Sequence, residues 1–117
     1  MTPLADHIYK QLRRRLRAKR PSITYAELAE ALDYRFAIHP RSSRLHAALG
    51  EVGEACRRER LPCLPAIVWR ADLRRPSVGY YKVAHPSARS DATRLAAWER
   101  EHARVIRDAA RFPRSLA

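Results

Sequence analysis

Arginine is the residue type in this sequence with the greatest capacity for specific chemistry. The chain has 24 Lys and Arg against 12 Asp and Glu, a formal net charge of +12 at pH 7. A guanidinium can form two parallel hydrogen bonds to a phosphate or to the edge of a guanine. Such a charge excess favours phosphate polymers over acidic small molecules as partners, although composition identifies neither the sequence nor the strand type.

Three groups of cations along the chain are the candidates for nucleic-acid contact. The first group lies near the N-terminus, where no acidic residue occurs between Asp6 and Glu27. The second begins a predicted helix in the middle of the chain, and the third lies between two β-prone runs. Together with a tyrosine and other polar neighbours, these groups give the predicted nucleic-acid-binding residues: Lys10, Arg13, Arg14, Arg17, Tyr25, Arg41, Ser43, Arg44, His46, Arg70, Arg74 and Arg75.

The cysteines and histidines form no recognisable catalytic or metal motif. Cys56 and Cys63 lack Cys-x-x-Cys spacing, and no histidine pair stands beside them at ligand spacing. We therefore expect reduced, buried thiols, no metal, no cofactor and no catalytic residue. A small basic nuclease is an alternative, with its acid and base drawn from the five histidines His7, His39, His46, His85 and His102.

Two patterns define the elements that carry the first group. Apolar residues recur at four-residue steps from Leu4 to Leu16, which predicts a helix over residues 4–19 that Pro21 ends. Thr24 and Glu27 form a capping box, so a second, short helix begins there and ends near Asp33. The segment 34–41 has no period and reads as the turn before the next helix.

Later segments complete a helix-turn-helix with a predicted wing. Ser42 or Ser43 caps a third helix that continues to about Arg60. The β-prone runs 66–69 and 78–83 predict a hairpin with a basic tip, and a last helix covers 90–111. The expected fold is one domain over 1–117, mainly α with a small β-hairpin: a winged helix-turn-helix with its core at 22–83.

Three motifs resemble the DNA-binding domain of O6-alkylguanine-DNA alkyltransferases and their inactive relatives, the alkyltransferase-like proteins. They are ITYAELA at 23–29, LHAAL at 45–49, and RLP at 60–62 followed by VGY at 78–80. The resemblance covers about half of the chain. It implies a winged helix that holds DNA.

The same resemblance argues against alkyl transfer. The family's Pro-Cys-His-Arg signature is absent, and no histidine follows Cys63 in its LPCLP context. Aligning the third helix with the family places Ser43 where the family has its nucleotide-flipping arginine, with Arg44 one residue further on.

The sequence thus favours a non-enzymatic nucleic-acid-binding protein, with DNA as the favoured partner. An alternative is an interaction protein or inhibitor whose basic surface docks an acidic protein or a ribonucleoprotein. No apolar run approaches the roughly 20 residues that span a bilayer, and the N-terminus lacks a signal-peptide apolar segment. We therefore expect a cytoplasmic protein with no membrane partner.

Overall fold

The computed structural model describes the backbone of residues 1–116 and their side chains apart from those of Asp33 and Tyr34. The elements in chain order are α1 (Pro3–Leu16), β1 (Ile23–Thr24), α2 (Tyr25–Phe36), α3 (Ser43–Arg58), a 3-10 turn η1 (Leu64–Ile67), β2 (Val68–Trp69), α4 (Val78–Ala84), α5 (Asp91–Arg107) and a 3-10 turn η2 (Ala109–Arg111).

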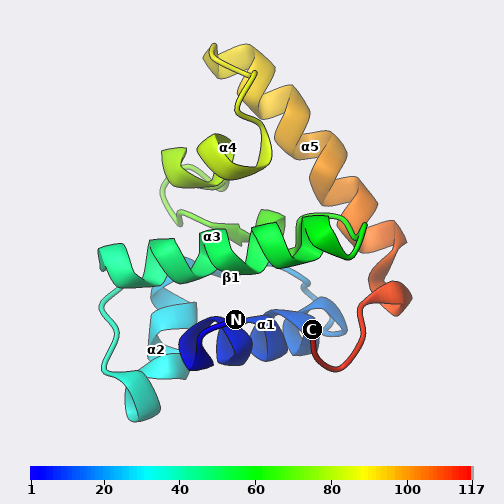
Figure 1. Cartoon of the computed structure of the whole chain (residues 1–117). Helices are drawn as coiled ribbons and strands as arrows, with labels where there is room; N and C mark the ends of the chain where they lie inside the picture. The colour runs from blue at the N-terminus through cyan, green and yellow to red at the C-terminus, as the bar shows by residue number, and fades with distance from the viewer. Residues whose placement is uncertain (117) are drawn as a thin grey trace.

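Helix α3 crosses the middle of the molecule, with α1 and α2 on one side and α4 and α5 on the other (Figure 1). One cluster of buried side chains extends from Leu4 in α1 to Leu116 near the C-terminus. The prediction of a mainly α fold is confirmed.

Helix α1 forms as its apolar spacing predicts but ends earlier. Leu4, Ile8, Leu12 and Leu16 are all buried. The helix ends at Leu16 rather than Lys19 because the Arg15 side chain draws the following chain back, its Nε donating to the carbonyls of Arg20 (3.1 Å) and Ser22 (2.9 Å).

The capping box at the start of α2 is confirmed. The Glu27 amide donates to Thr24 Oγ1 (3.1 Å), and the Thr24 amide donates to Glu27 Oε1 (3.0 Å). The helix continues one turn beyond the predicted end, to Phe36, whose half-buried ring packs against the core. The connection to α3 is therefore shorter than predicted and spans residues 37–42.

The predicted wing is wrong, because no hairpin joins 66–69 to 78–83. Only Val68–Trp69 is a strand, and it pairs in parallel with Ile23–Thr24 in the register Ile23↔Val68, Thr24↔Trp69. Residues 78–84 form α4 instead. Tertiary packing overrides the β-propensity of this segment, since the helix buries Tyr80 and Tyr81.

A half-buried histidine, His102, lies in an aromatic cluster beside β2. His102 stacks in parallel on Trp69 and lies 5.6 Å from Trp98, ring centre to ring centre. Its Nε2 has no hydrogen-bond partner among the described residues. Burial lowers the pKa of His102 below its ordinary value of 6.5, and burial acts in the same direction on His7 and His85.

These pKa shifts predict acid destabilisation. As pH falls through about 6.5, the unfolded chain binds protons that the folded chain resists, so stability is fully present above that value and declines below it. The free energy of unfolding in urea should be lower at about pH 5.5 than at about pH 7.5. His102→Phe should reduce the difference, because it removes one of the three histidines whose pKa is lowered. An equal pH dependence in the His102 variant would contradict the assignment.

Candidate nucleic-acid interface

The Tyr25 hydroxyl joins the start of α2 to the start of α4. It accepts hydrogen bonds from the Ser77 amide (3.0 Å) and the Ser77 hydroxyl (3.1 Å). The side chain is only 8% exposed, and burial raises the pKa of Tyr25 despite these two hydrogen bonds. The sequence predicts Tyr25 as a nucleic-acid contact. Its buried position instead gives Tyr25 a structural role, because its hydroxyl binds Ser77 and its ring contacts His46.

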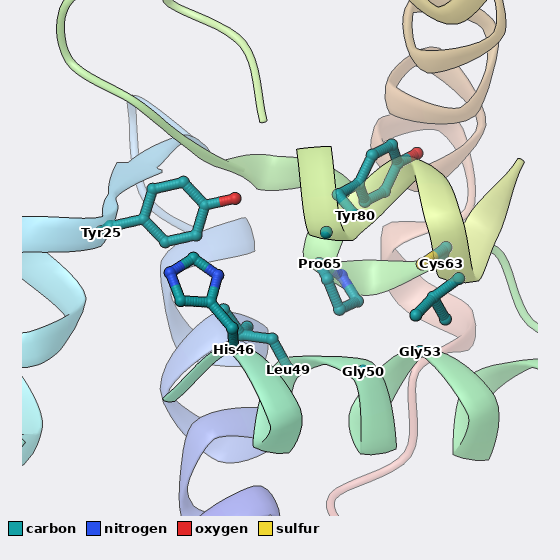
Figure 2. A pocket seen from close by; sticks show the side chains of 10 residues that line it. Tyr25, His46, Leu49, Gly50, Gly53, Cys63, Pro65 and Tyr80 are labelled. Atoms are coloured by element: carbon teal, nitrogen blue, oxygen red, sulfur yellow. The ribbon is translucent and has the colours of Figure 1, made fainter. Parts of the chain in front are cut away.

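His46 of α3 contacts the ring of Tyr25. The two rings face each other with their centres 5.1 Å apart, at one end of a pocket between α3 and α4 (Figure 2). Tyr80 and Cys63 lie toward the other end. The pocket encloses only about 30 Å³, which leaves room for a water-sized group and not for a drug-sized ligand.

Two glycines of α3 set the separation between α3 and α4. A Cβ at Gly53 would lie 3.3 Å from Cys63 Sγ and 3.5 Å from Val83, and a Cβ at Gly50 would lie 3.5 Å from Val83. Because Gly50 and Gly53 have no side chains, Val83 of α4 lies close to the backbone of α3. The pocket is therefore a packing feature of these two helices, closed by Val83.

Neither thiol is suited to nucleophilic chemistry. Burial raises the pKa of Cys56 to about 11, and burial raises the pKa of Cys63 well above its ordinary value. The thiolate, which is the reactive form, is therefore disfavoured at both positions. The Cys63 amide also donates to Glu101 Oε2 (2.7 Å), which fixes the backbone at this point.

The first turn of α3 presents cations to solvent. Ser42 is the N-cap, its Oγ accepting from the Arg44 amide (3.2 Å). Arg41, Ser43 and Arg44 are exposed, and the first turn contains no acidic residue. Arg44 Nη1 makes one long contact, at 3.5 Å, to the Phe36 carbonyl. These three predicted residues lie together, one turn before His46.

The third group forms a compact loop rather than a hairpin tip. The Arg70 amide donates to the Arg75 carbonyl (2.9 Å), and the Arg74 amide donates to the Arg70 carbonyl (2.8 Å). Arg70 binds Asp72 through two hydrogen bonds, and Arg75 pairs with Asp91 at the start of α5 (2.9 Å). Of the three predicted arginines, only Arg74 has no ion pair to a described acidic residue.

The first group of predicted cations lies on α1 and directly after it, away from the start of α3. Lys10 pairs with Asp6 (2.9 Å), and Arg13 Nε donates to the Phe112 carbonyl (2.9 Å), so both residues have structural partners. Arg14 and Arg17 are exposed at the C-terminal end of α1. The opposite end of α1 approaches α3, where the Thr2 amide donates to Glu51. A 14-residue helix is about 20 Å long, so Arg17 is remote from the start of α3.

Several residues near this surface were missed by sequence reasoning. Ser77 holds the Tyr25 hydroxyl, and Lys82 is exposed on α4. Leu73 and Val78 are large apolar residues that are 47% and 51% exposed. The strand interpretation of residues 78–83 concealed Lys82 and Val78, although Ser77 followed by an i, i+3 pair of apolar residues is a helix-start signal.

The histidines lie in separate surroundings. His46 faces Tyr25, His85 Nε2 lies 2.9 Å from the Tyr80 hydroxyl, and His102 stacks on Trp69. Among the described residues, no group of three or more His, Cys, Asp or Glu side chains is placed to hold a metal ion. Within residues 1–116, no helix combines the length and apolar character needed to cross a bilayer.

No protein-family model matches the chain, and comparisons with curated proteins and with solved structures find no significant match. The resemblance to alkyltransferase-like proteins therefore stays a prediction that rests on the three sequence motifs.

The central role of Tyr25 predicts the effect of Tyr25→Phe. Loss of the hydroxyl leaves the part-buried Ser77 amide without its acceptor, which costs roughly 1–3 kcal/mol of stability. The free energy of unfolding in urea measures this loss. Thr93→Ala, which removes a hydroxyl from the exposed cap of α5, is a matched control for losing one hydrogen-bonding group. Equal stability of Tyr25→Phe and the native chain would show that the hydroxyl does not hold α4.

Proposed function

We propose that the chain binds duplex DNA without catalysing a reaction on it, with α2 and α3 acting as a helix-turn-helix. The start of α3 enters the major groove, and the loop between Arg70 and Arg75 contacts the duplex beside it. The observation that carries this proposal is that exposed arginines lie in the two segments that Tyr25 joins. Arg41 and Arg44 lie at the start of α3, which also holds His46, and Arg74 lies in the loop that leads to Ser77.

The ion pairs distinguish these three arginines from their neighbours Arg70 and Arg75. Among the described side chains, eight cations, including Arg70 and Arg75, lie within 4.0 Å of an acidic group of the same chain. Arg41, Arg44 and Arg74 have no such pair to any described acidic residue. Phosphate contacts replace the counterions of such unpaired groups, and counterion release from DNA favours binding.

The exposed face of α3 supports close approach to a groove. Ser43, Ala47 and Gly50 lie three or four residues apart on one face of the helix, where Ser43 and Ala47 are exposed and Gly50 is half-exposed. Their small side chains let the helix backbone approach the DNA, while Arg44 has the reach to contact a base edge.

The helix also explains why DNA is favoured over RNA. The major groove of B-form DNA is wide enough to admit an α-helix, whereas the major groove of A-form RNA is deep and narrow. The loop takes the place of the predicted wing. Because Arg70 and Arg75 are internally paired, Arg74 is the residue of that group available to a phosphate.

The proposal predicts duplex binding that weakens steeply with salt. If about five phosphates are contacted, log K should fall with log salt at a slope of about −4 to −5. Arg44→Ala should cost roughly 1–3 kcal/mol and flatten any preference between sequences, and Arg74→Ala should weaken all duplexes alike. Fluorescence anisotropy from about 50 to about 200 mM salt measures both effects.

Arg107→Ala is the matched control, because it removes the same charge from the end of α5. That end lies by the C-terminus of α3, where Arg111 Nη2 donates to the Arg60 carbonyl. The effect of Arg107→Ala on duplex affinity should be small. If Arg44→Ala and Arg107→Ala weaken binding equally, only net charge matters and the groove assignment is wrong. A lack of duplex binding, together with a partner protein that survives nuclease treatment, would favour the protein-docking alternative.

A further inference from the structure

We propose that Leu73 is a wedge that inserts between base pairs of the bound duplex, with Arg74 fixing the adjacent phosphate. This inference rests on the proposed function and deepens it, because it gives the loop between Arg70 and Arg75 a specific action on DNA: local unstacking of a base step.

The first support is the exposure of Leu73. Burial of the leucines in the helices is nearly complete: those of α1 and α3 are at most 7% exposed, whereas Leu73 is 47% exposed. It lies in the middle of a loop whose ends are held together by the Arg70↔Arg75 bridge. Leu73 is not part of the core cluster that the buried leucines form.

The second support is the bracing of the loop. Two backbone hydrogen bonds close it, the double contact between Arg70 and Asp72 braces one side, and the Arg75–Asp91 pair ties the other side to α5. An exposed leucine on an unbraced loop would lose chain entropy on binding. On a braced loop, the side chain is preorganised to be buried by a partner without that further loss.

The third support is the backbone of Arg74. Its φ is 54°, in the left-handed region that residues other than glycine rarely adopt. Such a conformation persists when the surrounding structure enforces it, and it is concentrated at functional sites. Here it turns the chain immediately after Leu73, so that an apolar residue and a cation without a described acidic partner stand side by side.

The chemistry of this pair matches a duplex. Bases offer apolar stacking faces that lie directly inside a rim of phosphates, and minor-groove proteins insert Leu, Phe, Ile, Met or Pro between such steps. In a leucine next to an arginine, the leucine can contact the base faces and the arginine can contact a phosphate.

The loop is also connected to the rest of the proposed surface. Arg70 lies close enough to Tyr25 to lower the pKa of its hydroxyl, which opposes the larger effect of burial. Tyr25 in turn contacts His46, one turn after Ser43. Because the Tyr25 hydroxyl also accepts hydrogen bonds from Ser77, two residues after the loop, the same tyrosine joins the loop to α3.

A duplex containing 2-aminopurine, which fluoresces more strongly when unstacked, tests the wedge with the full-length chain. A set of duplexes with the probe at successive positions should show a severalfold increase at one or two adjacent steps. Leu73→Ala should abolish that increase and weaken binding by roughly fivefold to tenfold, from loss of the leucine burial. The salt slope should be unchanged, because no phosphate contact is lost. Leu73→Met should restore the increase.

Ile106 on α5, an aliphatic residue that is 39% exposed, supplies the matched control. Ile106→Ala should leave the fluorescence increase and the affinity unchanged. Duplex binding by the native chain without any increase, or an increase that survives Leu73→Ala in a protein that circular dichroism shows to be folded, would overturn the wedge while leaving the proposed function intact. Absence of duplex binding would overturn both.

Discussion

The hydroxyl of one buried tyrosine connects the segments on which the proposed interface depends. Tyr25 is the first residue of α2, and its hydroxyl accepts two hydrogen bonds from Ser77, the N-cap of α4. Its ring faces His46 of α3. Because a part-buried amide without an acceptor is costly, this contact fixes where α4 and the preceding loop lie relative to α3. The capping box at Thr24 and Glu27 places Tyr25 at the start of α2, so the sequence motif and the tertiary contact act on the same residue.

Internal ion pairs then divide the positive charge into two kinds. Some arginines have structural roles: Arg13 and Arg15 hold backbone carbonyls, and Arg75 joins the loop to α5. Others, such as Arg41 and Arg74, remain exposed without an ion pair to a described acidic residue. A net charge of +12 therefore overstates the charge available to a polymer at any one surface. The proposed docking geometry uses the unpaired arginines at the start of α3 and in the loop, whose segments Tyr25 joins.

The elements that could be predicted from sequence are those set by local signals. The four-residue apolar spacing of α1, the capping box of α2 and the serine cap of α3 all depend on residues within one or two turns. The end of α1 could not be predicted, because Arg15 reaches forward to the carbonyls of Arg20 and Ser22. The prediction of a wing was wrong for a related reason. Residues 78–83 combine valines and tyrosines that favour a strand, and tertiary packing, which buries Tyr80 and Tyr81, decides that they form a helix. The role of Arg75 was equally hidden, because its partner Asp91 is 16 residues away.

The most direct measurement of the central claim is the change in backbone amide chemical shifts when the isotopically labelled chain is titrated with a short duplex. The account predicts that the largest changes fall on residues 41–47 and 70–79, with little change at the C-terminal end of α1. Changes concentrated on residues 10–20, or spread evenly over every exposed arginine, would contradict a docking surface organised around Tyr25.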